Sequence, residues 1–565
     1  MKKYKIISVV LISIVTFLVF VPTLKNDLLR CWDDYIYVVD NQIIHRLSLE
    51  NLKKIFSTFL LGNYHPLTLS SFALEYQFFE SDSRVYHTTN LILHIVNSLL
   101  VFWLIFMLCK NLPVSIITAI LFSIHPLRAE PVAWVSGRKD LLAAIFFFTT
   151  LIFYLYYQKK RLIRFYYISL IVFVLSLLSK ATGVILPFVL LLFDYFTHQR
   201  FDKKALIGKI PYFVIALGFG VIAIFARQSY QAQLHEQVFT ITDKVFISIH
   251  RLIFYFFLRI FAPVPLVHLK PFLISNAGVY LAGSIIIIIV LILLVILLKK
   301  HTKKIVLFGL TFFFITILPA LNVVVLGYSA DRFTYIPSIG IFYIGAEGFF
   351  WLFRKKMKYT KLLRVILLII LIGTFAMLVY GSRQNCKIWQ NCLNLTGYFI
   401  ENYPNEPTTY LNRGIVYEYR GEYEKAIVYF TRAVEINPNY AEAYNRRANI
   451  YVGMKDYDKA IFDYNEALRL EPEYAEAYFN RGNAYYDIGY FDKAISDYTC
   501  ALKIDSTHAE VYYNRGNIYA HEGKRDEAIV DYTMTLLINP NHIRAYYNRA
   551  VTYLLEEDYE RAIAD

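Results

Sequence analysis

Residues 475–508 read AEAYFNRGNAYYDIGYFDKAISDYTCALKIDSTH, and this stretch decides the fold of the C-terminal part of the chain. Small residues at Gly482 and Ala494 let two helices approach closely, and the aromatic side chains of Tyr478 and Tyr498 fill the seam between them. The same pattern recurs about every 34 residues. Its positions in the other units are Tyr410, Gly414, Tyr417, Ala426, Phe430 and Ala433, then Tyr444, Ala448, Tyr451, Ala460, Tyr464 and Ala467, then Tyr512, Gly516, Tyr519, Ala528 and Tyr532.

A proline marks the same point of most units, where it ends the second helix because it cannot continue one. These prolines are Pro404, Pro438, Pro472 and Pro540, with Ser506 replacing the missing one. The pattern matches the tetratricopeptide repeat (TPR) and predicts an α-solenoid over 407–565, with four full repeats and a truncated fifth. The fifth unit stops at Asp565 inside its second helix, so we expect the array to continue or to fray there.

Polar residues recur inside the first helix of each repeat. The asparagines are Asn412, Asn480, Asn514 and Asn548, and each is followed by an arginine, as in Asn480–Arg481. Two interpretations stay open. The amides could bind the backbone of an extended acceptor peptide, as a similar ladder does in a soluble TPR-bearing glycosyltransferase family. Alternatively, the ladders keep the helices soluble and pair within a repeat, for example Arg481 with Asp497.

The N-terminal part is too apolar for a soluble domain, since 57% of the chain is hydrophobic and 17% is aromatic. A helix of about 20 apolar residues crosses a bilayer. We therefore predict an all-α membrane domain over 1–385, a linker over 386–406 and the repeats beyond it. About eleven predicted spans are Ile6–Leu24, Thr89–Cys109, Pro113–Ile124, Leu141–Tyr157, Ile163–Leu178, Gly183–Phe196, Tyr212–Ala226, Val279–Leu298, Ile305–Leu326, Ile336–Phe353 and Val365–Tyr380.

The net charge of +14 comes largely from basic clusters in short loops between apolar runs, such as Lys299–Lys304. This is the distribution typical of cytoplasmic loops, so we expect no nucleic-acid partner. Phe246–Pro263 carries two arginines and is interpreted as an amphipathic helix at the outer interface. The N-terminus is then cytoplasmic, and the repeats are periplasmic or extracellular. The composition suggests a bacterial plasma membrane. On that side Cys386 and Cys392 either form a disulfide or remain thiols.

The first external loop contains CWDDY, which places Asp33 and Asp34 just outside the first span. Adjacent acids there could act as a general base or bind a cation, although a solvated acid pair is also common. His65 follows in the same loop. The second span then carries polar residues on one face, which line a wet cavity or serve as hydrogen-bonding glue between helices. These four residues are His87, Asn90, His94 and Asn97.

Two later external loops carry further charges. The segment 125–140, HPLRAEPVAWVSGRKD, is dense in ionisable residues for a short turn at a membrane surface, and it includes Glu130, Arg138 and Lys139. Arg332 lies in a later loop, and an arginine fork matches two oxygens of a lipid phosphate. The chain has no Walker, dinucleotide-binding or zinc motif, which argues against an ATP-driven pump and favours a substrate already energised in the membrane.

The blocks WDDYIYVVDN, NYHPLT, YHTTNLILHIVN, HPLRAEPVAWVSGRKDLLAA, SKATGVILPFVLLLFDY and ADRFTYIPSIG, followed by TPRs, resemble the transmembrane and TPR repeat-containing proteins. These are glycosyltransferases of the GT-C fold. The resemblance implies transfer of a sugar, mannose in animal members, from a polyprenyl-phosphate donor to Ser or Thr of external proteins. Ser179-Lys180 is followed here by Ala181, where animal members tend to have Glu, so the resemblance predicts the reaction class and leaves the sugar open.

The resemblance implies that Asp33 and Asp34 include the catalytic base and that Arg332 contacts the donor phosphate, with Arg138 and Lys139. We expect His65, His87, His94 and Glu130 to position substrate. No metal site is expected, because two histidines without a third ligand more often form hydrogen bonds, and the lipid-linked sugar donor is the one cosubstrate. The alternative is a non-catalytic, membrane-anchored TPR scaffold for envelope proteins. A solute transporter is disfavoured, since the spans show no internal symmetry.

Overall fold

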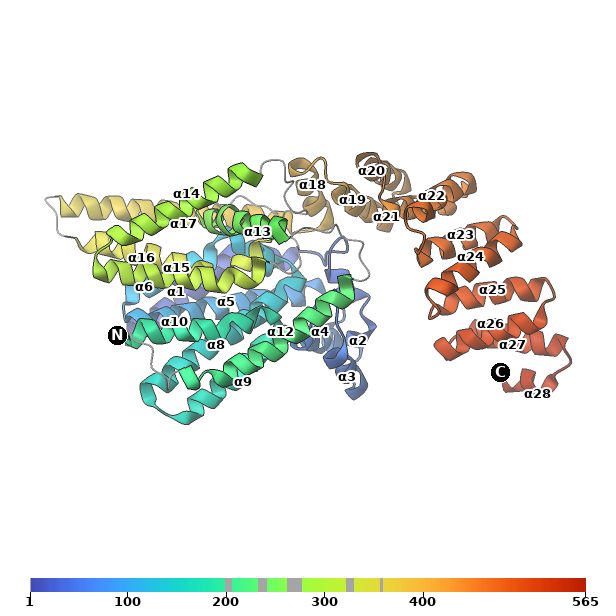
Figure 1. Cartoon of the computed structure of the whole chain (residues 1–565), viewed down its shortest axis with the longest axis horizontal. Helices are drawn as coiled ribbons and strands as arrows, with labels where there is room; N and C mark the ends of the chain where they lie inside the picture. The colour runs from blue at the N-terminus through green and yellow to red at the C-terminus, as the bar shows by residue number, and fades with distance from the viewer. Residues whose placement is uncertain (1, 199–205, 232–240, 262–276, 322–329, 356–358) are drawn as a thin grey trace. The chain divides into compact units, whose positions relative to one another are not determined.

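The computed structural model describes residues 2–198, 206–231, 241–261, 277–321, 330–355 and 359–565. All regular elements among these residues are helices, which confirms the predicted all-α fold. The chain divides into two compact units, Met1–Leu395 and Thr396–Asp565 (Figure 1). The predicted linker, 386–406, contains the end of one long helix and the whole of the next, so it is largely helical.

The first unit is built from long helices joined by short helical turns. Its α-helices are α1 (Lys2–Phe20), α2 (Gln42–His45), α3 (Leu49–Ser57), α4 (Pro66–Phe79), α5 (Ser83–Cys109), α6 (Leu112–Ile124), α7 (Ala129–Ala133), α8 (Arg138–Lys160), α9 (Ile163–Ser179), α10 (Leu186–His198), α12 (Ile210–Gln231), α13 (Ile241–His250), α14 (Ala277–Leu297), α15 (Lys300–Ile317), α16 (Ser338–Arg354) and α17 (Thr360–Ile388). The next helix, α18 (Cys392–Asn402), begins in the first unit and ends in the second. The short 3-10 and π turns are η1 (Val21–Lys25), η2 (Tyr35–Val39), η3 (Pro126–Arg128), η4 (Val135–Gly137), η5 (Ala181–Ile185), η6 (Arg251–Phe257), η7 (Leu258–Ile260), η9 (Leu318–Leu321) and η10 (Asp331–Thr334).

The predicted count of eleven spans is not confirmed. Within the described ranges, 6 helices are long and apolar enough to cross a membrane: Lys3–Lys25, Ser83–Cys109, Val135–Lys160, Ile210–Gln228, Thr302–Leu321 and Thr360–Ile388. A seventh candidate is a pair of helices, Leu112–Ile124 and Pro126–Ala133, bent by 59°. Several other predicted spans are apolar helices of fewer than 18 residues, such as Ile163–Ser179. The end of the predicted span Ile305–Leu326 lies outside the described residues.

Close helix packing forms the core of the first unit. The rings of Phe122, Phe148 and Tyr335 meet there, with centroids 5.0 Å apart for Phe122 and Tyr335. Where α15 crosses α16, Gly309 and Gly340 bring the two backbones together. A Cβ atom on either glycine would collide with the carbonyl oxygen of the other, so small residues are required at this crossing.

The segment expected to be an interfacial helix packs into the bundle instead of lying apart from it. Its described part contains α13, η6 and η7, and both of its arginines are buried. Arg259 pairs with Asp331 at 2.5 Å. Phe256 and Phe257 join the main core. Burial of a charge is tolerated here because Asp331 offsets it.

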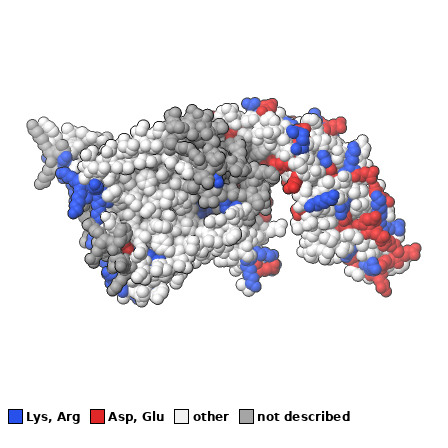
Figure 2. All heavy atoms as spheres, in the orientation of Figure 1, with Lys and Arg blue, Asp and Glu red and all other residues white. Residues whose placement is uncertain are grey.

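Charge is distributed unevenly over the first unit. Figure 2 shows Lys and Arg side chains gathered at one end, whereas the broad middle of the visible face carries almost none. That end contains the N-terminus and the junction of α14 with α15 (Figure 1). An uncharged belt with basic residues at one rim is typical of a protein that spans a membrane.

The second unit is the predicted TPR solenoid. Its helices are α19 (Pro407–Tyr419), α20 (Tyr423–Ile436), α21 (Ala441–Gly453), α22 (Tyr457–Leu470), α23 (Ala475–Asp487), α24 (Phe491–Ile504), α25 (Ala509–His521), α26 (Arg525–Ile538), α27 (Ile543–Leu555) and α28 (Tyr559–Ala564). A Cβ atom on Gly482 would lie 2.7 Å from the Tyr498 ring, so this glycine makes room for the aromatic seam. The packing confirms the roles predicted for the small and aromatic positions.

The arginine ladder pairs within repeats. Arg481 donates two hydrogen bonds to Asp497, both 2.7 Å long, which confirms the pair expected from the sequence. The asparagine ladder links successive repeats. Asn514 donates to Asn483 at 3.0 Å, and Asn548 donates to Asn517 at 2.8 Å. Asn480 donates in the same way to Asn445, and Asn412 is half-buried on the first helix of the array.

Candidate functional site

The loop that follows α1 and η1 is tied to the segment that follows α17. A disulfide joins Cys31 to Cys392, so the suggested Cys386–Cys392 pairing is wrong, and Cys386 is a buried thiol. The side-chain amide of Asn26 also donates to the carbonyl oxygen of Trp389 at 3.1 Å. Cys386 faces the core of the helical bundle, whereas Cys392 opens the next helix beside the loop. The loop that carries the two acids is therefore covalently held.

Asp34 is the structural member of the acid pair. It is fully buried, and its carboxylate accepts hydrogen bonds from the backbone N–H of Leu29 at 3.1 Å and from the backbone N–H of Ser136 at 2.8 Å. The Ser136 hydroxyl donates a third bond at 2.5 Å. Burial raises the pKa of Asp34 to about 6, although the three hydrogen bonds lower this pKa. Asp34 thus fastens the acid loop to the turn that precedes α8.

Asp33 is the accessible member of the pair, with 36% of its side chain exposed. Its carboxylate lies 3.9 Å from the ammonium of Lys139, in the first turn of α8. Lys139 is held in place by aromatic rings, 4.6 Å from the Tyr37 centroid and 5.0 Å from that of Trp134. A partly exposed carboxylate can accept a proton from a substrate, and a fixed cation beside it stabilises the ionised carboxylate before the transfer.

Two further cations act on Lys139. Lys180, directly after α9, pairs with Asp140 at 2.5 Å. Arg332, in η10, pairs with Glu130, and its backbone N–H also donates a hydrogen bond to that carboxylate at 3.0 Å. The charges of Lys180 and Arg332 both act on Lys139, so the three cations share one electrostatic environment.

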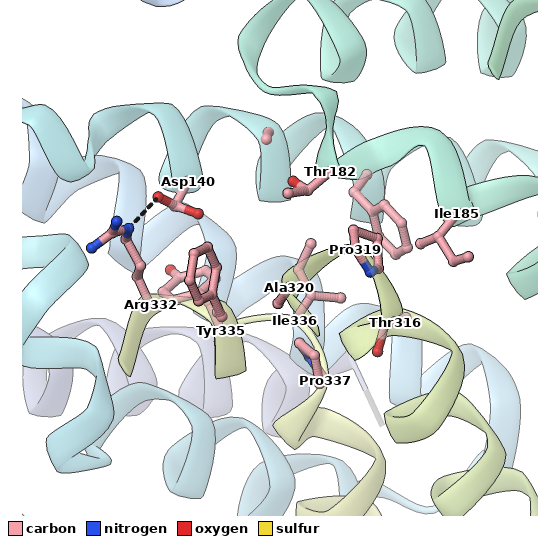
Figure 3. A pocket seen from close by; sticks show the side chains of 13 residues that line it. Asp140, Thr182, Ile185, Thr316, Pro319, Ala320, Arg332, Tyr335, Ile336 and Pro337 are labelled. Carbon is pink, nitrogen blue, oxygen red and sulfur yellow. Dashed lines mark ion pairs between the residues drawn. The ribbon is translucent and has the colours of Figure 1, made fainter. Parts of the chain in front are cut away.

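A pocket opens beside these charges. Asp140 and Arg332 lie at one side of it, joined by the dashed line in Figure 3, and Thr182, Ile185, Pro319, Ala320 and Ile336 lie at the other. The pocket is therefore charged on one wall and mostly apolar on the opposite wall. Its volume is about 30 Å³, enough for one or two water molecules but not for a whole sugar ring.

His65 lies at the edge of the same cluster. It is buried, with its ring 5.2 Å from that of Tyr37. Burial lowers the pKa of His65 well below its ordinary value, and the charges of Lys139 and Lys180 add to this. The imidazole is therefore neutral at physiological pH and can donate or accept a hydrogen bond but carries no charge.

The structure separates the other predicted residues from this cluster. The guanidinium of Arg138 binds Glu75 at 2.5 Å, the Asn90 amide at 3.0 Å and the backbone carbonyl of Tyr86. His94 bridges helices through the Tyr335 hydroxyl and the carbonyl oxygen of Ser123, which fits the interpretation as interhelical glue. His87 is fully buried in α5.

The segment 125–140 is not an exposed surface turn. It forms η3, α7 and η4, and Arg128, Glu130 and Arg138 are all buried. Glu130 holds Arg332 and so acts on the arginine rather than lining an open surface. The charges are buried because each one meets an opposite charge or a hydrogen-bonding partner brought by another helix.

Sequence reasoning missed Asp140 and Lys180 as site residues. Both stood in quoted blocks, Asp140 at the end of GRKD and Lys180 in SKATG. Their signal was a charged residue directly beside a long apolar run, which is costly unless a partner is present. The sequence did not show that the two residues meet, because 40 positions separate them.

Fold and site together define a helical membrane protein with a charged pocket beside its long helices and a TPR array in its second unit. TPR models match residues 448–489 and 482–523, and further tetratricopeptide models match 407–440, 429–462, 509–542 and 543–565. The predicted resemblance is also confirmed, because the chain is similar to curated TMTC-type protein O-mannosyl-transferases.

The human protein O-mannosyl-transferase TMTC3 is 32% identical over 124 residues, which cover 20% of this chain and 13% of the human protein. The Caenorhabditis elegans protein O-mannosyl-transferase F38B6.6 is 26% identical over 205 residues, covering 33% of this chain and 28% of the worm protein. The matched regions thus span less than a third of these relatives. Among solved structures, MamA is 26% identical and covers 27% of this chain and 88% of its own, with a TM-score of 0.26.

Proposed function

We propose that this protein is a membrane glycosyltransferase that moves a sugar, in the first instance mannose, from a polyprenyl-phosphate donor to a Ser or Thr hydroxyl of a protein outside the cytoplasm. The proposal agrees with the names of its curated relatives, which are protein O-mannosyl-transferases. It rests chiefly on one observation. A partly exposed acid, Asp33, lies 3.9 Å from Lys139, whose electrostatic environment includes Lys180 and Arg332, and Arg332 lines a pocket with an apolar wall.

The surroundings of the pocket, with charges on one side and apolar residues on the other, suit the end of a donor that joins an anionic head to an apolar chain. Arg332 and Asp140 form its charged wall, Lys180 is paired with Asp140, and Lys139 lies within the electrostatic range of Arg332 and Lys180. Cations bind phosphate oxygens strongly in a partly buried site, because little water screens them there. We leave Arg138 out of the donor site, since its guanidinium is already used by Glu75, Asn90 and Tyr86.

The proposed reaction is a direct displacement. Asp33 takes the proton of the acceptor hydroxyl while the hydroxyl oxygen bonds to the anomeric carbon of the sugar. The bond from that carbon to the phosphate oxygen breaks, and the phosphate leaves with the electron pair and its lipid. Arg332, Lys139 and Lys180 stabilise the charge that develops on the leaving phosphate. One base and one displacement invert the configuration of the anomeric centre.

The TPR array is proposed to hold the acceptor. Binding a protein near the membrane raises its effective concentration at the transfer site without any new chemistry. Asn412, Asn480, Asn514 and Asn548 remain the candidate peptide-binding residues. Three of them already link neighbouring repeats, so a bound peptide would add to an existing hydrogen-bond chain.

The disulfide supports the placement of the acid loop outside the cytoplasm, because disulfides persist in oxidising compartments. The N-terminus is then proposed to be cytoplasmic, together with the basic end of the first unit, in a bacterial plasma membrane. A scaffold without catalysis explains this arrangement poorly. A membrane anchor has no use for several charges buried beside a pocket, and burying each charge costs free energy.

The test is sugar transfer in isolated membranes with labelled polyprenyl-phosphate mannose and protein-bound label as the readout. Asp33→Asn should lower the rate by about 10²–10⁴-fold, the usual contribution of a positioned base. Asp40→Asn is the matched control, because Asp40 is an exposed acid of the same loop. It should transfer at the wild-type rate. Full activity of Asp33→Asn would refute the assignment, and no transfer with any lipid-linked sugar in a panel would refute the function.

A further inference from the structure

Two buried polar atoms on one wall of the pocket have no hydrogen-bond partner among the described residues. They are Oδ2 of Asp140 and Nε of Arg332, which lie 3.9 Å apart. Figure 3 shows both side chains on the same wall of the pocket. Buried polar atoms in native proteins are nearly always paired, so an unpaired acceptor opposite an unpaired donor requires an explanation.

One other atom of each side chain already forms a buried ion pair. Oδ1 of Asp140 binds the ammonium of Lys180 at 2.5 Å, and Nη1 of Arg332 binds Glu130. Neither side chain can therefore turn toward the other without breaking a buried ion pair, which is costly. The gap of 3.9 Å is thus held open by contacts on both sides.

The chemistry of the gap selects one kind of group. A ligand there must donate a hydrogen bond to Oδ2 and accept one from Nε–H. A hydroxyl does both, whereas a phosphate oxygen is repelled by the carboxylate and an ammonium is repelled by the guanidinium. Two hydrogen bonds of about 2.8 Å span a 3.9 Å gap with an angle of about 90° at the hydroxyl oxygen, which is open enough for both.

We propose that Asp140 and Arg332 form a recognition site for one hydroxyl group of the donor sugar. This inference rests on the proposed function. The small volume of the pocket fits a single edge of a sugar ring that carries one hydroxyl. The acceptor hydroxyl has a different place, at the more exposed Asp33. The Nε–H of Arg332 then donates a hydrogen bond to the sugar hydroxyl, while the rest of its guanidinium remains available to the phosphate.

Deoxy donors test this site. Polyprenyl-phosphate mannose is compared with four analogues that lack the 2-, 3-, 4- or 6-hydroxyl, and kcat/KM is measured for each. Sites that hydrogen-bond a substrate hydroxyl strongly reject the analogue without it. The wild type should use one of the four analogues at least about 100-fold less well than the parent, and the other three within about 10-fold.

Two variants test whether Asp140 and Arg332 cause the preference for the parent donor over the deoxy analogue. Asp140→Asn keeps the shape but removes the charged acceptor, and Arg332→Lys keeps a cation for the phosphate but removes the Nε donor. Both should reduce the 100-fold preference to about 10-fold or less. Asp194→Asn is the matched control, because Asp194 is a buried aspartate paired with Lys209 away from the pocket. It should retain the full preference even if less folded protein is obtained.

The outcomes separate the hydroxyl site from the function itself. If the parent donor is used and all four deoxy donors react equally well, the gap holds a water or the acceptor, and the inference is wrong. An unchanged preference in both Asp140→Asn and Arg332→Lys, with folded protein, would overturn it too. If the wild type transfers no sugar from the parent donor, the proposed function fails and this inference fails with it.

Discussion

The two neighbouring acids should respond to alanine substitution in opposite ways. Asp34→Ala removes the acceptor of two backbone N–H groups, those of Leu29 and Ser136, and of the Ser136 hydroxyl. An unsatisfied buried donor costs about 1–3 kcal/mol, so two backbone donors give a loss of about 2–6 kcal/mol. Asp33→Ala removes only a half-exposed ion pair, which is worth at most about 1 kcal/mol.

The effect of Asp34→Ala should also depend on pH. Burial raises the pKa of Asp34 to about 6 from its ordinary 3.8, so the folded protein holds this proton more tightly than the unfolded chain. The contribution of Asp34 to stability is then full below pH 3.8 and falls as the pH rises through 6, by about 3 kcal/mol in total. Asp34→Ala should therefore destabilise more at pH 4 than at pH 7.

The assay combines thermal unfolding in detergent, followed by tryptophan fluorescence at pH 4, 5, 6 and 7, with initial transfer rates below the unfolding midpoint. Asp34→Ala should lower the midpoint and retain transfer per folded molecule. Asp33→Ala should keep the midpoint and lose transfer. The reverse result, with turnover lost only in a fully stable Asp34→Ala protein, would make Asp34 the base and refute the assignment.

Three further results are expected. Cys31→Ser and Cys392→Ser should each lower the unfolding midpoint to that of the reduced wild type. A wild-type midpoint that does not change with reductant would contradict the disulfide. Arg138→Met should destabilise the fold by about 3–5 kcal/mol, because it leaves the Glu75 carboxylate unpaired. Its folded fraction should keep the wild-type KM for the donor, and a raised KM would return Arg138 to the donor site. Arg481→Met should loosen the middle repeats, seen as faster hydrogen exchange there, with unchanged exchange in the first unit.

The solenoid was predictable because its determinants are local and repeated. Gly482 and Tyr498 lie in one repeat, and so do Arg481 and Asp497, so the period itself brings them together. The membrane part was less predictable. Hydropathy identifies apolar runs, but it does not show that the helices on either side of His125 bend by 59° or that several runs form helices too short for a full span.

Part of the candidate site was predictable from the local sequence. Asp33 and Arg332 were found because charges beside apolar helices are rare. The direction of each side chain was not available from the sequence. Arg138 and Lys139 are adjacent, yet successive positions of a helix point about 100° apart, so one binds Glu75 and the other faces Asp33. The disulfide partner of Cys392 was hidden because it lies 361 residues away.

That separation has a consequence for how the protein is made. Cys31 emerges from the ribosome 361 residues before Cys392. At a synthesis rate of about 5–20 residues per second, Cys392 is made roughly 20–70 s after Cys31. Every candidate span between the two cysteines must be synthesised before the bond can close. The loop that carries Asp33 is thus locked only after the whole membrane unit has been synthesised, and the oxidation state of Cys31 reports whether biogenesis has reached that point.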